Sequence, residues 1–199
     1  MTWATLAQVK EEAKITNTND DALLTRLLAA AQARLEADTD RLFDVSVNTT
    51  RYFRINRDVI GRTLWLDRDL CAINTITNGN GVVVTSDQYV TEPRNYAADG
   101  YPIYAITLTA YSGVVWQWMT DPDVDQIAVS GKWGYTSTPT AEAIEALIQY
   151  AIWLYRRKDA TGDSERPLLA GDGTILLPSH IPDFVKVFIE SYRFRQIRY

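Results

Sequence analysis

The sequence is poor in the residues that build disulfide-bonded domains and most metal sites. It contains one cysteine, Cys71, and one histidine, His180, among 199 residues. A single cysteine excludes a disulfide within the chain, and these two residues are too few for the usual structural zinc site. The apolar setting of Cys71 favours a packed, inert thiol. A lone histidine is weak support for serine–histidine–aspartate catalysis, so we interpret His180 as a surface or interface residue.

Long apolar runs and an excess of positive charge are also missing. No apolar stretch approaches the ~18 residues of a membrane-spanning helix, and the first residues lack the order of a signal peptide. The formal net charge is −5, whereas proteins that read DNA sequence present a clearly basic face. We therefore expect a soluble, cytosolic protein without membrane contact, whose negative surface would repel a nucleic-acid backbone.

Aromatic residues, in contrast, are abundant, with 6 Trp and 11 Tyr. These side chains combine an apolar body with a polar tip, which suits half-exposed packing and protein–protein interfaces. One alternative function follows from them. In a carbohydrate- or surface-binding β module, Trp116, Trp118 and Trp133 would be exposed stacking platforms.

Hydrophobic periodicity predicts helices towards both ends of the chain. The first helical region spans about 5–43, where Thr5 and Gln8 have capping-box spacing and a polar connector precedes the second helix. Leu42 and Phe43 are expected to close this region onto the core. A further helix is predicted over 138–158, with Thr138 as its cap and Pro139 in its first turn.

Between these helices, the region 45–135 consists of short β-rich runs separated by turns. No helix separates the runs, so no parallel crossover unit forms and the strands are antiparallel. The sequence therefore predicts an α+β fold, a helical bundle formed by the N- and C-terminal helices with an inserted antiparallel β lobe. We treat 1–199 as a single domain, in which 160–199 provides a long loop, a last amphipathic helix and a basic, aromatic tail.

No catalytic or cofactor motif emerges from the polar residues. The run Asp121, Asp123, Asp125 begins like a calcium loop but lacks the glycine and the final acid that the loop needs. Asp67 and Asp69 are two carboxylates without an evident cleft partner, although a hydrolase using these acids or those of 121–125 is a second rival. The glycine-containing stretches match no phosphate-binding loop. We expect no enzyme activity, no cofactor and no metal.

Two stretches resemble a known family. TLAQVKEEAKI followed by DDALLTRLLAAAQARLEADTDRLF is similar to the N-terminus of phage head–tail connector proteins. VSGKWGYTSTPTAEAIEALIQYAIWLYRR is similar to their second signature, in which a strand ends in Gly-x-Trp-Gly-Tyr and a helix ends in Tyr-Arg-Arg. Together these blocks cover some 70 residues in the right order. The β region between them and the tail after 160 are longer than in the smallest members of the family.

The resemblance implies a structural virion protein of the neck, assembled in the host cytoplasm. Its expected partners are the portal protein, copies of itself in a ring of twelve, and a stopper or tail-completion protein below. DNA would pass through the lumen without sequence-specific binding.

Three groups of residues are candidates for this role. A structural corner between strand and helix is predicted at Gly131, Trp133, Gly134, Tyr135 and Pro139. The portal or a neighbouring subunit is expected to contact the tail through Tyr192, Arg193, Phe194, Arg195, Arg198 and Tyr199. The acids Asp121, Asp123 and Asp125 are candidates to face the channel, with an ordinary solvated turn as the favoured alternative.

Overall fold

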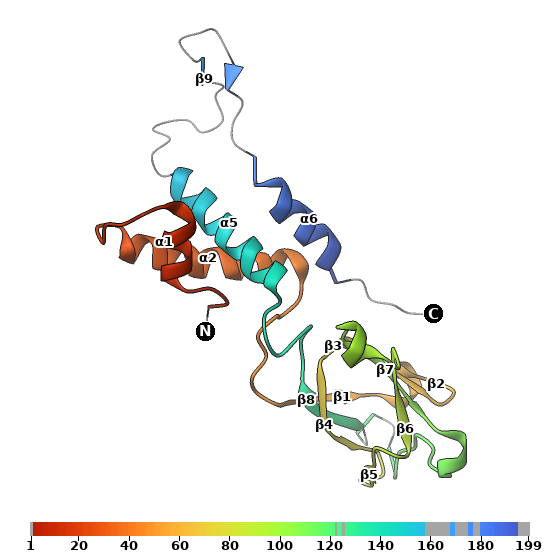
Figure 1. Ribbon diagram of the computed structural model, residues 1–199. Coiled ribbons are helices and arrows are strands. Elements are labelled where there is room, and N and C mark those ends of the chain that lie inside the picture. The colour runs from red at the N-terminus through yellow and green to blue at the C-terminus, as the bar shows by residue number, and fades with distance from the viewer. Residues whose placement is uncertain are drawn as a thin grey trace. The chain divides into compact units, whose positions relative to one another are not determined.

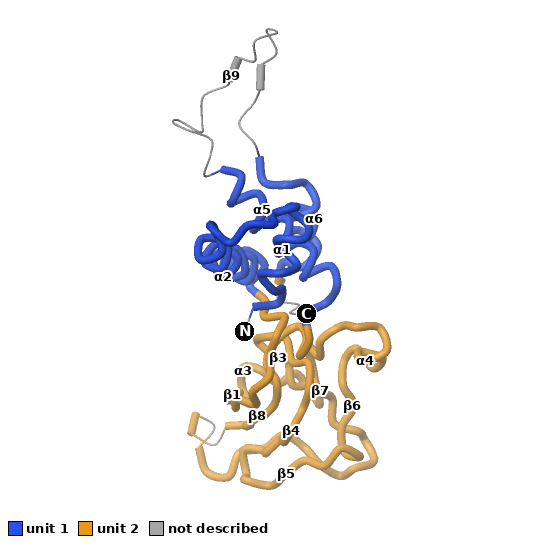
Figure 2. The backbone as a smooth tube through the Cα atoms, turned by 60° about the vertical axis from the view of Figure 1, so that its left-hand side comes forward, with its two compact units in different colours: residues 1–40, 139–193 blue, residues 41–138, 194–199 orange. Residues whose placement is uncertain are grey.

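The computed structural model describes residues 2–121, 123–124, 126–157, 168–169, 175–176 and 180–194. The chain divides into two compact units, a helical unit of residues 1–40 and 139–193 and a β unit of residues 41–138 and 194–199 (Figures 1 and 2). The β unit is thus inserted between two parts of the helical unit, and the predicted α+β class is confirmed. Among the described residues, no helix is long and apolar enough to cross a membrane.

The described part of the helical unit contains four helices. These are α1 (Leu6–Ala13), α2 (Asp21–Thr39), α5 (Ala141–Arg157) and α6 (Asp183–Tyr192). α5 contacts the other three, and α2 also contacts α6. The buried face of α5 contains Ala143, Ala146 and Ala151, whose small side chains let neighbouring helices approach closely. The helical segments from both ends of the chain therefore share one core.

The ends of these helices follow from local chemistry, with two departures from the predictions. The capping box at Thr5 is present, since its hydroxyl accepts from the Gln8 N–H and the Gln8 side chain accepts from the Thr5 N–H. α5 begins at Ala141, because Thr140 accepts the Ala143 N–H at 3.2 Å. The predicted start at Thr138 and Pro139 was therefore wrong by about three residues.

The second departure is at the end of the first helical region. α2 ends at Thr39 because Asp40 adopts a left-handed conformation, with φ 53°. Leu42 is 48% exposed, so its predicted place in a core was wrong. Its backbone carbonyl instead accepts the N–H of Tyr135 at 2.8 Å. Phe43 is fully buried, as predicted, and its ring contacts Tyr135 in the β unit.

The β unit contains two four-stranded sheets in which every pairing is antiparallel. The first has the order β1 (Thr49–Phe53), β8 (Ile127–Lys132), β4 (Ala72–Thr77), β5 (Val83–Val84). The second has the order β2 (Val59–Ile60), β3 (Thr63–Leu70), β7 (Ile103–Leu108), β6 (Tyr89–Glu92). Short helices lie at Ile55–Asp58 (α3), Tyr96–Asp99 (α4) and Ala110–Ser112 (η1). β9 (Leu168–Leu169) pairs with β10 (Ile175–Leu176).

One hydrophobic core serves both sheets. Buried residues alternate along β8, as expected for a strand with one inward face. Phe53 and Ile76 of the first sheet belong to the same cluster as Leu64 and Ile106 of the second. The two sheets therefore pack face to face around shared side chains, as in a small sandwich. The turn predicted at Asn78–Gly81 closes the β4–β5 hairpin, with Gly81 at φ 80°.

Candidate assembly surfaces

Four residues of the predicted corner, Gly131, Trp133, Gly134 and Tyr135, lie within the β unit, whereas Pro139 belongs to the helical unit. Gly131 lies in β8 between β1 and β4, opposite Thr49 and Ile73. A side chain there would collide with the carbonyl oxygen of Ala72, and one at Gly134 would collide with the side chain of Val45. Both glycines are thus required by the close approach of neighbouring chain segments.

The aromatic residues of the corner fill the β unit's interior. Trp133 is buried, its ring contacts Phe53 at 5.8 Å between centroids, and its indole N–H donates to the carbonyl oxygen of Thr49 at 3.0 Å. Tyr135 is buried against Phe43, with the Arg41 guanidinium 4.8 Å from its ring centre. These contacts join the segment that enters the β unit to the strand that leaves it.

The other two tryptophans of the stacking hypothesis differ from each other. Trp116 is buried and donates its indole N–H to the carbonyl oxygen of Arg62 at 2.9 Å. Trp118 is 44% exposed. With Trp116 and Trp133 both in the core of the β unit, a binding platform of three exposed indoles does not form.

The predicted tail surface is described as far as Phe194. The Tyr192 hydroxyl donates to Glu142 at 2.6 Å, and the Tyr192 ring contacts Phe188 in a tilted arrangement, 4.7 Å between ring centres, within the helical unit. Phe194 belongs to the β unit, where the guanidinium groups of Arg41 and Arg68 lie 5.8 and 5.4 Å from its ring centre. Arg193 is exposed. Arg195, Arg198 and Tyr199 lie outside the described residues.

The acidic run is an ordered turn where the structure describes it. The Asp121 carboxylate accepts the N–H of Asp123 at 2.8 Å, and the Asp123 carboxylate lies 3.5 Å from Arg54. Asp125 lies outside the described residues. An exposed, partly paired turn matches the alternative favoured from the sequence, and whether it faces a channel stays a prediction.

The remaining candidates for chemistry are separated in the structure. Asp67 pairs with Arg51 at 2.9 Å, and the buried Asp69 pairs with Arg41 at 3.2 Å, so each carboxylate has its own cation. Burial raises the pKa of the Cys71 thiol, whose sulfur lies 3.4 Å from the carbonyl oxygen of Lys132. Within the described part of the chain, no group of three or more potential ligand residues is placed to hold a metal ion.

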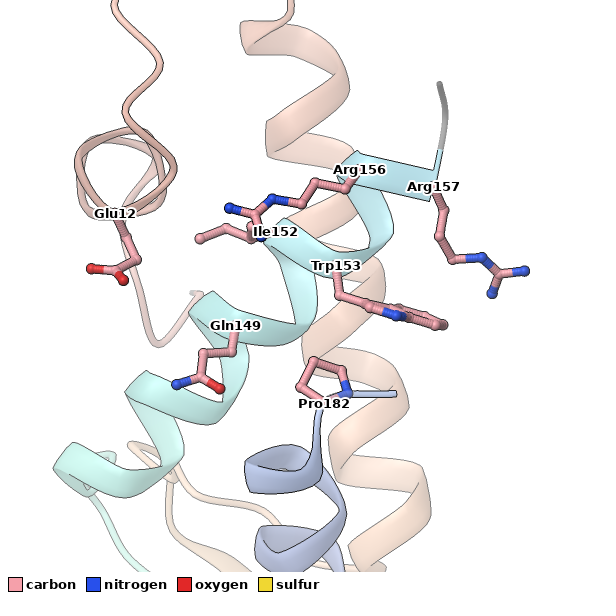
Figure 3. A pocket seen from close by; sticks show the side chains of 7 residues that line it. All are labelled: Glu12, Gln149, Ile152, Trp153, Arg156, Arg157 and Pro182. Atoms are coloured by element: carbon pink, nitrogen blue, oxygen red, sulfur yellow. The ribbon is translucent and has the colours of Figure 1, made fainter. Parts of the chain in front are cut away.

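A groove on the helical unit was not foreseen from the sequence. It has a volume of about 410 Å³ and lies where α1, α5 and the residue before α6 meet. The side chains of Gln149, Ile152 and Arg156 extend from α5 towards Glu12 of α1, whereas those of Trp153 and Arg157 extend away from Glu12 (Figure 3). The Arg157 guanidinium covers the Trp153 ring at 4.7 Å. The i, i+3, i+4 spacing of Gln149, Ile152, Trp153, Arg156 and Arg157 places these groove residues on one side of α5, and this spacing is the part of the site that is visible in the sequence.

Comparison with known proteins gives a family and a fold. Residues 3–62 match the model of the phage gp6-like head-tail connector proteins. No curated protein sequence matches the chain. The matched segment includes the first of the two stretches quoted above, and the resemblance to the head–tail connector family is confirmed.

Solved structures extend the likeness to the whole chain. A chain in the neck of an empty GTA particle, computed with C6 symmetry, has a TM-score of 0.56 and 15% identity, over 99% of this chain and 92% of that one. A chain in the neck of a native GTA particle, computed with C12 symmetry, has a TM-score of 0.54 and 16% identity, over 97% and 90%. A chain in the virion of the native gene transfer agent has a TM-score of 0.54 and 16% identity, over 99% of this chain and 92% of that one. At this identity the likeness establishes a shared fold.

Proposed function

We propose that this head–tail connector protein of a phage-like particle is an adaptor subunit, which forms a ring beneath the portal and links the head to the neck and tail. The observation that carries the proposal is the shared fold over 99% of the chain with a neck protein, together with the family match at residues 3–62. DNA passes through the lumen of the ring, and the subunit performs no catalysis.

Ring formation is supported by the symmetry of the related necks, which were computed with C6 and C12 symmetry. A ring of identical subunits requires one surface of each copy to meet a different surface of the next. Twelve copies would match the higher of these symmetries. The net charge of −5 suits a wall past which DNA slides without binding.

The tail, Tyr192–Tyr199, is proposed to attach the subunit to the portal or to a neighbouring copy. The described part has partners in its own chain, since Tyr192 donates to Glu142 and Phe194 lies beside Arg41 and Arg68. These contacts fix where the tail leaves the fold. Arg195, Arg198 and Tyr199 then supply the cations and the aromatic anchor that reach the partner.

Deleting residues 195–199 tests this attachment without removing Tyr192 or Phe194. We expect the truncated chain to unfold at the same urea concentration as the full chain but to lose binding to purified portal rings, seen by co-sedimentation and negative-stain imaging. The variant R26E, which reverses an exposed charge on α2, is the control and should bind normally. Unchanged portal binding by the truncated chain would contradict the role of the tail.

A further inference from the structure

The outer face of α6 carries two exposed apolar side chains. Phe184 is 42% and Val187 60% exposed, whereas Val185 and Phe188 of the same helix are buried. Asp183 and Glu190 are exposed and flank the apolar pair, and Lys186 lies 3.1 Å from Asp183. We call Asp183, Phe184, Val187 and Glu190 the α6 outer face. Paired exposed apolar residues ringed by charges are typical of an interaction surface.

The groove carries the opposite charge. It is lined by Glu12, Ile152, Trp153, Arg156 and Arg157, so basic groups outnumber acidic ones. Its floor is apolar, because Ile152 is buried and Trp153 is half-buried beneath Arg157. Two guanidinium groups and one carboxylate surround that floor. The α6 outer face offers two carboxylates beside one ammonium group, so the two surfaces are complementary in charge and share an apolar centre.

Val187, the more exposed apolar residue of the α6 outer face, lies on the opposite side of α6 from the buried Val185. Successive residues of an α-helix are rotated by about 100°, so Val187 is turned by about 200° from Val185. Val185 is buried towards the other helices, which α6 contacts at α5 and α2. Val187 is therefore turned away from α5, which supplies most of the groove, and a copy does not fill its own groove with this side chain.

We infer that the α6 outer face of one copy docks into the groove of the next copy, with Phe184 and Val187 on Ile152 and Trp153, and with Asp183 and Glu190 beside Arg156 and Arg157. Such a contact joins two different surfaces and repeats from copy to copy, which is the head-to-tail arrangement that closes into rings. This inference rests on the proposed function and names the surfaces that build its ring.

Photo-crosslinking tests the contact directly. p-Benzoylphenylalanine replaces Phe184 in the full chain, and half of the protein molecules are labelled with ¹⁵N. The mixture is irradiated alone at rising concentration, and again on portal rings. We expect adducts that join a labelled to an unlabelled copy and that map to residues 149–157. Adducts confined to one copy, adducts that map elsewhere, or no adduct would each overturn the inference.

Complementation provides a second and independent test. The variants R156E/R157E and F184D/V187D each lose one surface, so we expect each to self-associate at least about tenfold more weakly than the parent chain. An equimolar mixture retains one intact pair of surfaces and should give a 1:1 dimer by mass photometry. R26E and V47D change an exposed arginine and an exposed valine outside both surfaces and should behave as the parent.

The outcomes separate this inference from the proposed function. If the parent forms rings on the portal while both double variants do so equally well, the docking contact is wrong and the ring remains. If the mixture is no more associated than either variant alone, the contact is also wrong. If the parent neither self-associates nor binds the portal, the proposed function fails as well. Circular dichroism of each variant establishes that it is folded.

Discussion

Trp133 lies between Gly131 and Gly134 because the backbone on both sides of it runs close to other segments. The indole packs on Phe53 in the core of the β unit, the Arg51 guanidinium lies 5.2 Å from its ring centre, and its N–H reaches the carbonyl oxygen of Thr49. A ligand-stacking role would need an exposed ring. The segment Gly131–Gly134 therefore stabilises the β unit. Any assembly surface depends on that stability.

Replacing this indole should destabilise the fold before it affects any partner. We expect Trp133→Ala to lower the free energy of unfolding by about 3–5 kcal/mol, because it removes a large buried ring and leaves a cavity. Urea denaturation followed by circular dichroism measures the change. Trp118→Ala, at a tryptophan that is 44% exposed, is the matched control and should cost much less. A Trp133→Ala variant that is as stable as the parent but unable to assemble would contradict the expectation that the substitution acts on stability first.

Replacing Gly131, two residues before Trp133, provides a second test at the residue scale. In Gly131→Ala, the new methyl group would meet the carbonyl oxygen of Ala72 in the neighbouring strand, and backbone atoms cannot move aside as a flexible side chain can. We expect a loss of about 1–3 kcal/mol in thermal or urea unfolding, as for other overpacked sites. Ser130→Ala, at the adjacent position of β8, is the control. Equal stability of the two variants would show that the strands can separate at little cost.

At the scale of elements, most of the fold was predictable because the signals are local. Alternating apolar residues gave β3, β7 and β8, and helical spacing gave α2, α5 and α6. The capping box at Thr5 was also legible. The end of α2 was not, since a left-handed Asp40 carries no strong sequence signal compared with glycine.

The start of α5 shows how two neighbouring threonines compete. Thr138 followed by proline is a reasonable cap in the sequence, but the hydroxyl that accepts the first free N–H belongs to Thr140. We expect Thr140→Ala to lower the free energy of unfolding by about 1 kcal/mol. Thr138→Ala should change it by no more than a few tenths, because the hydrogen bonds between the exposed Thr138 and Thr136 use the backbone N–H and carbonyl oxygen of Thr138, which alanine keeps. If Thr138→Ala proves the costlier substitution, the assigned cap is wrong.

The candidate surfaces were harder to predict than the elements. Sequence pattern identified the aromatic, basic tail, but it could not show that Tyr192 and Phe194 have partners in their own chain. The groove combines α5 and Pro182 with Glu12 of α1, which lies more than a hundred positions earlier, so no local pattern could assemble it. Tertiary packing decides which exposed residues become a surface.

At the scale of the whole molecule, the inserted arrangement separates two tasks. The helical unit carries the groove and the α6 outer face, the two surfaces that we infer to join neighbouring copies. The β unit carries the aromatic core and the residues around Phe194 from which the tail leaves. Substitutions in the β core should therefore act through stability, and substitutions on the helical surfaces through assembly. The single domain over 1–199 stays a prediction, which the coupling of the two units in unfolding would test.

The central claim is that copies of this chain form a closed ring on a portal. Native mass spectrometry of the purified portal ring, before and after incubation with the chain, counts the copies bound. The account predicts a single complex heavier by twelve chains of 22.5 kDa, matching the C12 symmetry of the related neck. A portal whose mass does not change, or a broad distribution of partly bound portals that persists at saturating concentration, would contradict it.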